Sequence, residues 1–148
     1  MKIKLMCHKN NYDKYKVMLE KAGFTISNDA NLTFKEDDYH PDTFIGEYQS
    51  SFEIIHYTKI IYIESFGHDI VLHTLEKSFS IREKLYEVEG ILHGKSFVRI
   101  NKSQVVNIKA IKEIKPTFNS RIILLMKNEE TLTVTRNYAP AFKRSIGL

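Results

Sequence analysis

The chain has 148 residues, of which 43% are hydrophobic and 27% are charged, a composition typical of a soluble globular protein. Its longest apolar runs, such as Ile122 to Met126, are far too short to span a bilayer, and the N-terminus lacks the apolar stretch of a secretory signal. The single Cys7 cannot form an internal disulfide. We therefore expect a cytoplasmic protein without a membrane partner.

Charge is distributed unevenly along the chain, whose overall net charge is +4. Residues 1–51 carry seven lysines against eight acidic residues, a net of −1. Residues 93–148 carry eleven basic residues against three acidic ones, a net of +8. A basic segment of this kind fits either a face that binds a polyanion or an ordinary solvated surface.

The first thirty residues are predicted to form a small β-α-β unit. Residues 2–7 alternate between apolar and polar side chains, which is the pattern of a half-buried strand. Apolar residues at helical spacing follow between Tyr12 and Ala22, and Gly23 stands where a helix is expected to end. Residues 24–26 then provide a second short strand.

Residues 27–51 are polar and rich in turn-forming residues, so we read them as a linker or a packed loop. A further short strand around Leu32 and Phe34 is compatible with this pattern. The sequence therefore predicts that residues 1–50 form a small α/β appendage with its linker, and that residues 51–148 form the main domain.

From residue 52 the sequence changes to short apolar segments separated by polar turns. Residues 57–65 and 70–75 flank the turn at 66–69 and predict a hairpin. Ser80 and Glu83 have the spacing of a capping box, followed by an apolar helical stripe that reaches Leu92. Further short strands are expected at 97–100, 105–108, 111–114, 122–126 and 131–134, and a last helix at 137–146 with Pro140 in its first turn. The fold class is therefore mainly β (α+β), with small antiparallel sheets and peripheral helices.

Four blocks of this second part occur in a characteristic order. The first is Ile60-Ile61-Tyr62-Ile63-Glu64-Ser65 with a turn and His68, and the second is the helical segment 82–89. The third is Phe97 to Asn107, with Phe-x-Arg, a short polar step, Ser and a β-branched pair before Asn, and the fourth is Val134-Thr135-Arg136-Asn137-Tyr138. Together these blocks resemble the LytTR family of DNA-binding domains over about residues 52–148.

The resemblance implies an elongated β fold of small sheets stacked side by side, with DNA bound by loops that enter successive major grooves on one face of the duplex. It also implies a homodimer on repeated half-sites. Most members of the family carry an N-terminal receiver domain with a phospho-accepting Asp. We expect the first fifty residues to be too few for such a domain, and the chain to be a stand-alone LytTR regulator without a receiver.

The resemblance also places His68, Lys102 and Arg136 on DNA-facing loops. An imidazole can bond a base edge or a phosphate, a lysine can reach guanine or a phosphate, and the guanidinium fork suits guanine or two phosphate oxygens. The alternatives are an ordinary exposed turn histidine at His68, and a surface ion pair of Arg136 with Glu129 or Glu130.

Three further candidates are weaker. Asn101 could contact adenine through both polar atoms of its amide, or it could hold the turn by bonding the backbone. Arg121 and Lys115 belong to a predicted hairpin, and their charge and position suggest contacts with phosphate groups.

Other polar residues of the same blocks are expected to be structural. Arg99 lies within a strand and is predicted to pair with an acid such as Glu64 across the sheet. Ser103 and Asn107 are predicted to bond backbone groups of the turns.

The sequence thus predicts a bacterial transcription regulator that binds double-stranded promoter DNA sequence-specifically through loops. An RNA-binding module or a small protein-interaction module with the same basic face are the alternatives. The six histidines show no metal-ligand spacing, Cys7 and His8 point to opposite faces of a strand, and there is no glycine-rich phosphate loop. We therefore expect no enzymatic activity, no metal and no cofactor.

Overall fold

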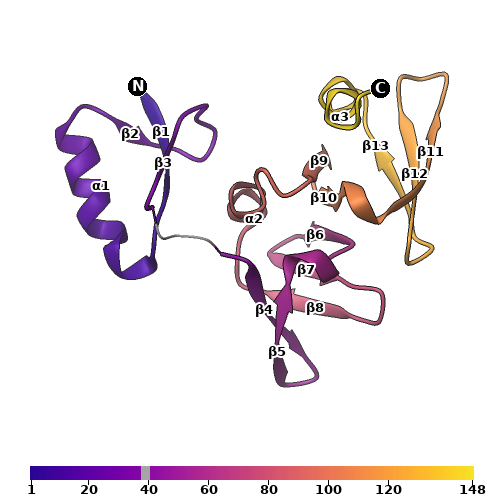
Figure 1. Ribbon diagram of the computed structural model, residues 1–148, viewed down its shortest axis with the longest axis horizontal. Helices are drawn as coiled ribbons and strands as arrows, with labels where there is room; N and C mark the ends of the chain where they lie inside the picture. The colour runs from indigo at the N-terminus through magenta and orange to yellow at the C-terminus, as the bar shows by residue number, and fades with distance from the viewer. Residues whose placement is uncertain (38–40) are drawn as a thin grey trace. The chain divides into compact units, whose positions relative to one another are not determined.

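The computed structural model describes residues 1–37 and 41–148, which form two compact units, Met1–Pro41 and Asp42–Leu148 (Figure 1). Residues 38–40, part of the expected linker, lie outside the described residues. Within the described part of the chain, no helix combines the length and the apolar character needed to cross a membrane.

The first unit is a β-α-β unit with one additional strand, which confirms the expected elements. Its central strand β1 is parallel to both of its neighbours, β2 and β3. Gly23 follows the helix with a φ of +96°, a conformation that glycine adopts without steric cost. The elements in chain order are β1 (Lys2–Met6), the short 3₁₀ turn η1 (Lys9–Asn11), α1 (Tyr12–Lys21), β2 (Thr25–Ile26) and β3 (Thr33–Lys35).

The second unit contains a seven-stranded sheet with the order β5-β4-β8-β7-β6-β10-β9, in which all neighbours are antiparallel. The strands are β4 (Thr43–Tyr48), β5 (Ser51–His56), β6 (Tyr62–Phe66), β7 (Asp69–His73), β8 (Ser78–Ile81), β9 (Phe97–Asn101) and β10 (Gln104–Asn107). The 3₁₀ turn η2 (Tyr57–Lys59) leads into β6, and η3 (Ile108–Ala110) follows β10.

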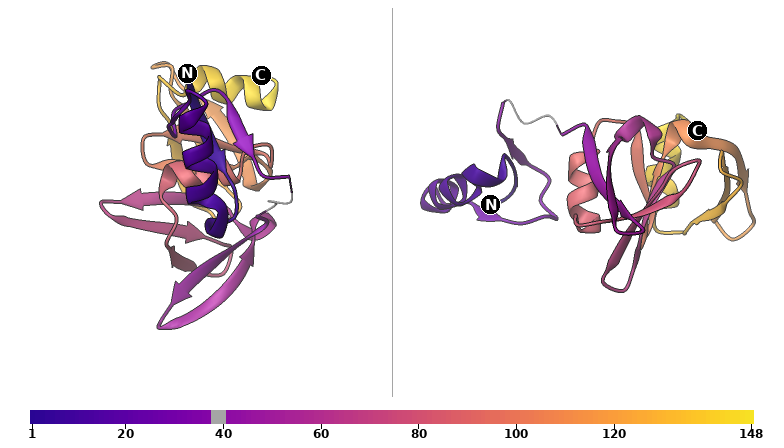
Figure 2. Two further views of the ribbon diagram at one scale, coloured as in Figure 1. Left: turned by 90° about the vertical axis from the view of Figure 1, so that its left-hand side faces the viewer. Right: turned by 90° about the horizontal axis from the view of Figure 1, so that it is seen from below.

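A three-stranded antiparallel sheet completes the second unit, together with two helices. Its order is β11-β12-β13, so consecutive strands are neighbours. The β4–β5 hairpin and α3 lie at opposite ends of the unit (Figures 1 and 2). The elements are α2 (Leu85–Ile91), β11 (Ile111–Pro116), β12 (Ile122–Met126), β13 (Thr131–Val134) and α3 (Ala139–Ile146).

The large sheet is covered by apolar residues on both faces, as the alternation along β6 shows. Ile63 is fully buried in a core that includes Leu85 and Val88 of α2. Its neighbour Tyr62 points to the other face, into a second core built from β12, β13 and Phe142 of α3. The predicted fold of several small antiparallel sheets with peripheral helices is confirmed.

The division between the units lies at residues 41 and 42, and not at 50 and 51 as expected. Residues 43–48 form β4, and Phe44 on this strand is buried in the core. Gly46, one of the residues that suggested a linker, lies in the β4–β5 hairpin instead. A side chain on Gly46 would lie 2.6 Å from atoms of Ile55 and Phe79, and the turn residues Gln49 and Ser50 have positive φ.

The capping box predicted at Ser80 and Glu83 is also wrong. Ser80 lies inside strand β8, where Phe79 and Ile81 alternate into the core with the period of a strand. Helix α2 begins at Leu85, and the side chain of Glu87 accepts a hydrogen bond of 3.3 Å from the backbone nitrogen of Lys84.

We predict that a fragment starting at Asp42 folds, whereas one starting at Phe52 is less stable by at least about 3 kcal/mol. The shorter fragment loses the burial of Phe44 and the hydrogen bonds of β4, and deletion of a buried Phe side chain alone costs about 3–5 kcal/mol. Urea denaturation followed by circular dichroism measures the difference. Equal stability of the two fragments would show that β4 is dispensable.

Candidate nucleic-acid interface

Two tight turns of the large sheet lie side by side and present His68 and Lys102. Because β6 and β10 are antiparallel neighbours, the β6–β7 turn and the β9–β10 turn emerge at the same end of the sheet. The backbone nitrogen of Ser65 donates a 2.9 Å hydrogen bond to the carbonyl of Ser103, which joins the two turns directly. His68 and Lys102 are both exposed.

The small sheet brings Arg121 and Arg136 to the same end. The backbone nitrogen of Thr135 donates a 3.0 Å hydrogen bond to the carbonyl of Ile100, so the end of β13 lies against the end of β9. Arg136 follows Thr135 directly, and Arg121 immediately precedes β12, the strand paired with β13. A hollow of about 370 Å³ lies between the segments that carry these two arginines. The hollow is lined by Asn119, Arg121, Thr135, Arg136 and Asn137.

The structure therefore gathers four predicted residues, His68, Lys102, Arg121 and Arg136, into what we call the basic loop cluster. All four are exposed, and none forms an ion pair within residues 1–37 and 41–148. Lys115 lies within strand β11, opposite Ile123 of β12, and not on a turn. Its side chain is also exposed.

The ion pair considered for Arg136 does not form. Glu129 is instead 3.1 Å from the ammonium group of Lys112, and Glu130 has no basic partner in the part of the chain that the structure describes. The guanidinium group of Arg136 thus keeps its donors available to a ligand.

Asn101 holds the β9–β10 turn with all the hydrogen bonds its side chain can make. Its amide nitrogen donates to Gln104 Oε1 at 2.8 Å and to the carbonyl of Thr133 at 3.0 Å. Its oxygen accepts from the backbone nitrogen and the hydroxyl of Ser103, at 2.9 and 3.1 Å. An amide with two donors and two acceptor lone pairs is then fully used. This geometry favours the turn-holding interpretation of Asn101 over an adenine contact.

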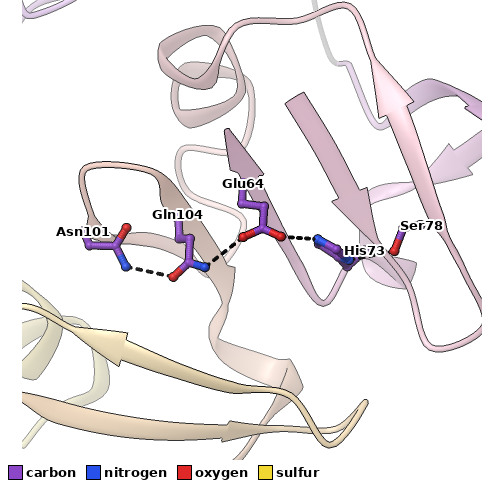
Figure 3. Close-up of polar contacts among 5 residues, drawn as sticks. All are labelled: Glu64, His73, Ser78, Asn101 and Gln104. Carbon is purple, nitrogen blue, oxygen red and sulfur yellow. Dashed lines mark hydrogen bonds and ion pairs between the residues drawn. The ribbon is translucent and has the colours of Figure 1, made fainter. Parts of the chain in front are cut away.

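The polar network continues from Asn101 across the sheet to Ser78 (Figure 3). Gln104 Nε2 donates to Glu64 Oε2 at 3.0 Å, and His73 Nε2 lies 2.7 Å from Glu64 Oε1. Because an ionised carboxylate only accepts, His73 Nε2 is the donor, and in a neutral imidazole Nδ1 then accepts from the hydroxyl of Ser78 at 2.7 Å. Five side chains from five strands are thereby linked.

Tyr62 packs against the network at His73. Its ring stacks on the His73 ring with 4.2 Å between the centroids. Burial, together with the negative charges of Glu64 and Glu130, raises the pKa of Tyr62 to about 12. The phenol therefore stays neutral at physiological pH.

Arg99 holds the same turn from another direction. Its Nε donates to the carbonyl of Asn101 at 3.0 Å, and Nη2 donates to the carbonyl of Lys102. Nη1 pairs with Glu89 on α2 at 3.2 Å, so the predicted partner Glu64 is wrong. The structural role expected for Arg99 is observed, but its position against the Lys102 turn was not predicted. The Phe-x-Arg block was the only sequence signal for it.

Asn107 has the backbone contacts that the sequence suggested, whereas the hydroxyl of Ser103 donates to the side-chain oxygen of Asn101 rather than to the backbone. Asn107 is buried, donates to the carbonyl of Ile60 at 2.9 Å and accepts from the backbone nitrogen of Lys109 at 3.0 Å. The backbone nitrogen of Ser103 is bound by Asn101, as described above.

Comparison with known proteins gives consistent matches. The sequence profile of the LytTr DNA-binding domain matches residues 50–147. The chain is 34% identical over 100 residues to the sensory transduction protein LytT of Bacillus subtilis, covering 68% of this chain and 40% of that protein. It is 26% identical over 129 residues to the transcriptional regulatory protein LytR of Staphylococcus aureus, covering 87% of this chain and 50% of the relative. The chain thus spans half or less of the length of these relatives.

A solved structure matches as well. It is described as the LytTr DNA-binding domain of a putative methyl-accepting/DNA response regulator from Bacillus cereus. The superposition has a TM-score of 0.70 at 26% identity and covers 73% of this chain and 99% of the solved chain.

We predict that Asn101→Asp lowers the free energy of unfolding by about 1–3 kcal/mol, because a carboxylate cannot donate to Gln104 or Thr133 and leaves both acceptors without a partner. Urea denaturation measures the loss. Asn119→Asp, the same chemical change at an exposed position, is the control and should change stability by less than about 0.5 kcal/mol. Equal effects of the two substitutions would argue against the network.

Proposed function

The chain belongs to the family of LytTR DNA-binding domains, and on that premise we propose that it is a cytoplasmic transcription regulator that binds promoter DNA sequence-specifically through the basic loop cluster. The observation that carries this proposal is the convergence of three exposed cationic side chains, Lys102, Arg121 and Arg136, and the exposed imidazole of His68, from separate loops, on one end of the second unit. None of them is neutralised by a carboxylate in the described residues.

Within this proposal, the residues divide into those that read bases and those that hold phosphates. Arg136 and His68 are assigned to base edges, since a guanidinium fork matches guanine and an imidazole can bond a base edge in the major groove. Lys102 reaches guanine or a neighbouring phosphate. Arg121 and Lys115 are assigned to phosphate oxygens, which fix the protein on the duplex without reading sequence.

Asn101 and Arg99 act indirectly in this scheme. Both side chains are engaged in hydrogen bonds to the β9–β10 turn, so they position Lys102. Binding of two copies to repeated half-sites is part of the proposal and rests on the family alone.

We predict a steep dependence of duplex binding on salt. If roughly five to eight phosphates are neutralised, the slope of log affinity against log salt is about −4 to −7. Titration of a promoter fragment at several salt concentrations measures the slope. A flat response would contradict DNA binding through this cluster. Stronger binding to an RNA duplex of equal length would instead indicate an RNA-binding module.

We predict that Arg136→Ala weakens binding to the specific site by about 1–3 kcal/mol and leaves binding to a scrambled duplex nearly unchanged, because it removes a base contact. Lys115→Ala, by contrast, should weaken both and make the salt slope shallower by about one. The measurement is a titration of both variants against the two duplexes at two salt concentrations.

The two variants serve as controls for each other, since both side chains are exposed and neither substitution should affect folding. Equal losses on the two duplexes for Arg136→Ala would assign Arg136 to phosphate. A lowered thermal stability of that variant would assign it to an internal contact.

A further inference from the structure

A second basic region surrounds a cavity at the other end of the second unit. The cavity has a volume of about 630 Å³ and is bounded by the end of β5, η2, the β7–β8 turn, η3 and the β12–β13 turn. Volumes of about 300–1,000 Å³ are usual for pockets that bind small molecules.

The cavity lies away from the basic loop cluster. The 3₁₀ turns η2 and η3 stand where β6 begins and β10 ends, whereas the cluster occupies the turns where β6 ends and β10 begins. The small sheet separates the two regions in the same way. Lys127 of the cavity follows the end of β12, whereas Arg121 of the cluster precedes the start of β12. Binding of DNA at the basic loop cluster, as proposed above, therefore does not account for this cavity.

The floor of the cavity is apolar. It is formed by the buried side chains of Ile55, Ile61, Phe79 and Ala110, all at most 6% exposed. Leu75 and Ile54 extend this apolar surface to the rim, where they are 65% and 77% exposed. An apolar floor that reaches the surface accommodates an apolar ligand body.

The rim is strongly basic, with five lysines against two glutamates. One lysine, Lys77, is paired with Glu53. The ammonium group of Lys95 lies 5.6 Å from the ring centroid of Tyr57, on the cavity wall. Four lysines have no carboxylate partner within the described ranges: Lys59, Lys95, Lys109 and Lys127.

We propose that this cavity binds a small amphiphilic anion, whose apolar body lies on the floor and whose carboxylate, sulfonate or phosphate faces the rim lysines. The charge of the rim selects an anion, and the apolar floor selects against a simple inorganic ion. The volume favours a small molecule over a folded partner. The proposal does not depend on which residues contact DNA.

The fluorescent probe anilinonaphthalene sulfonate tests the proposal with the full chain, since it combines an aromatic body with one anionic group. We expect saturable binding of one probe per chain, with stronger binding than for the uncharged phenyl-naphthylamine of the same shape. Leu75→Glu should weaken probe binding at least about fivefold relative to Leu75→Gln, because it places a negative charge at the anionic end of the ligand. Leu75 is exposed, so neither substitution should disturb the fold, which circular dichroism verifies.

Lys95→Met should weaken the probe about threefold to fivefold, and Lys143→Met on α3 should not, since Lys143 is exposed and outside the cavity. Equal probe binding by the Leu75→Glu and Leu75→Gln variants would overturn the proposal. So would a Lys95→Met variant that binds the probe normally but loses affinity for scrambled duplex, because the rim would then be a phosphate-binding surface. Both results are independent of specific promoter binding.

Discussion

The second unit depends on how one buried carboxylate is accommodated. Glu64 is 9% exposed and is the only buried acidic residue among residues 1–37 and 41–148. Removing an ionised carboxylate from water costs several kcal/mol unless hydrogen bonds compensate for the lost solvation. Gln104 and His73 provide those bonds from the two neighbouring strands. A shift of register in either strand would leave the carboxylate without partners, so Glu64 favours a single alignment of β7, β6 and β10.

The same network fixes the loops that the proposed function uses. Gln104, which bonds Glu64, also accepts a hydrogen bond from Asn101. Asn101 in turn bonds both the β9–β10 turn and the carbonyl of Thr133 in the small sheet. The two sheets are thereby joined close to the basic loop cluster. Ligands lose less conformational entropy on binding to loops that are already ordered. A short turn held by Asn101 and Arg99 therefore suits recognition of base edges, where donors must match fixed acceptor positions.

Much of this fold could be predicted from the sequence, and the errors have identifiable physical causes. The strands β9 to β13 were predicted because each is a short apolar segment bounded by polar turn residues, and α3 because Pro140 fits the first turn of a helix. β4 was missed because Gly46 resembles a linker residue, although the close approach of Ile55 and Phe79 requires it. Ser80 was assigned to a helix cap because its spacing from Glu83 fits a local motif. The pairing of Ser80 with Val71 of β7 and with Glu47 of the distant strand β4 makes this segment a strand instead.

The candidate site shows the same limit. The resemblance supplied His68, Lys102 and Arg136, but no local pattern shows that Arg121 lies at the same end of the unit. That placement follows from the pairing of β12 with β13 and from the contact of Thr135 with Ile100. The partner of Arg99 was mispredicted for a related reason. Arg99 and Glu64 lie in the same sheet, yet Glu64 faces the network whereas Arg99 reaches Glu89 of α2. Side-chain direction depends on the bulge between β9 and β10, which only the structure reveals.

The strands also explain why one small unit can carry two basic surfaces with different uses. Antiparallel strands have turns at both ends, and each end collects residues that are far apart in the sequence. At one end the cations stand on exposed turns, a geometry that suits an extended polyanion. At the other end the lysines surround an apolar floor that a duplex, with its hydrated phosphates, cannot fill. The net charge of the segment 93–148 cannot distinguish these two surfaces, since it counts Lys102 and Lys109 alike, although β10 holds them at opposite ends.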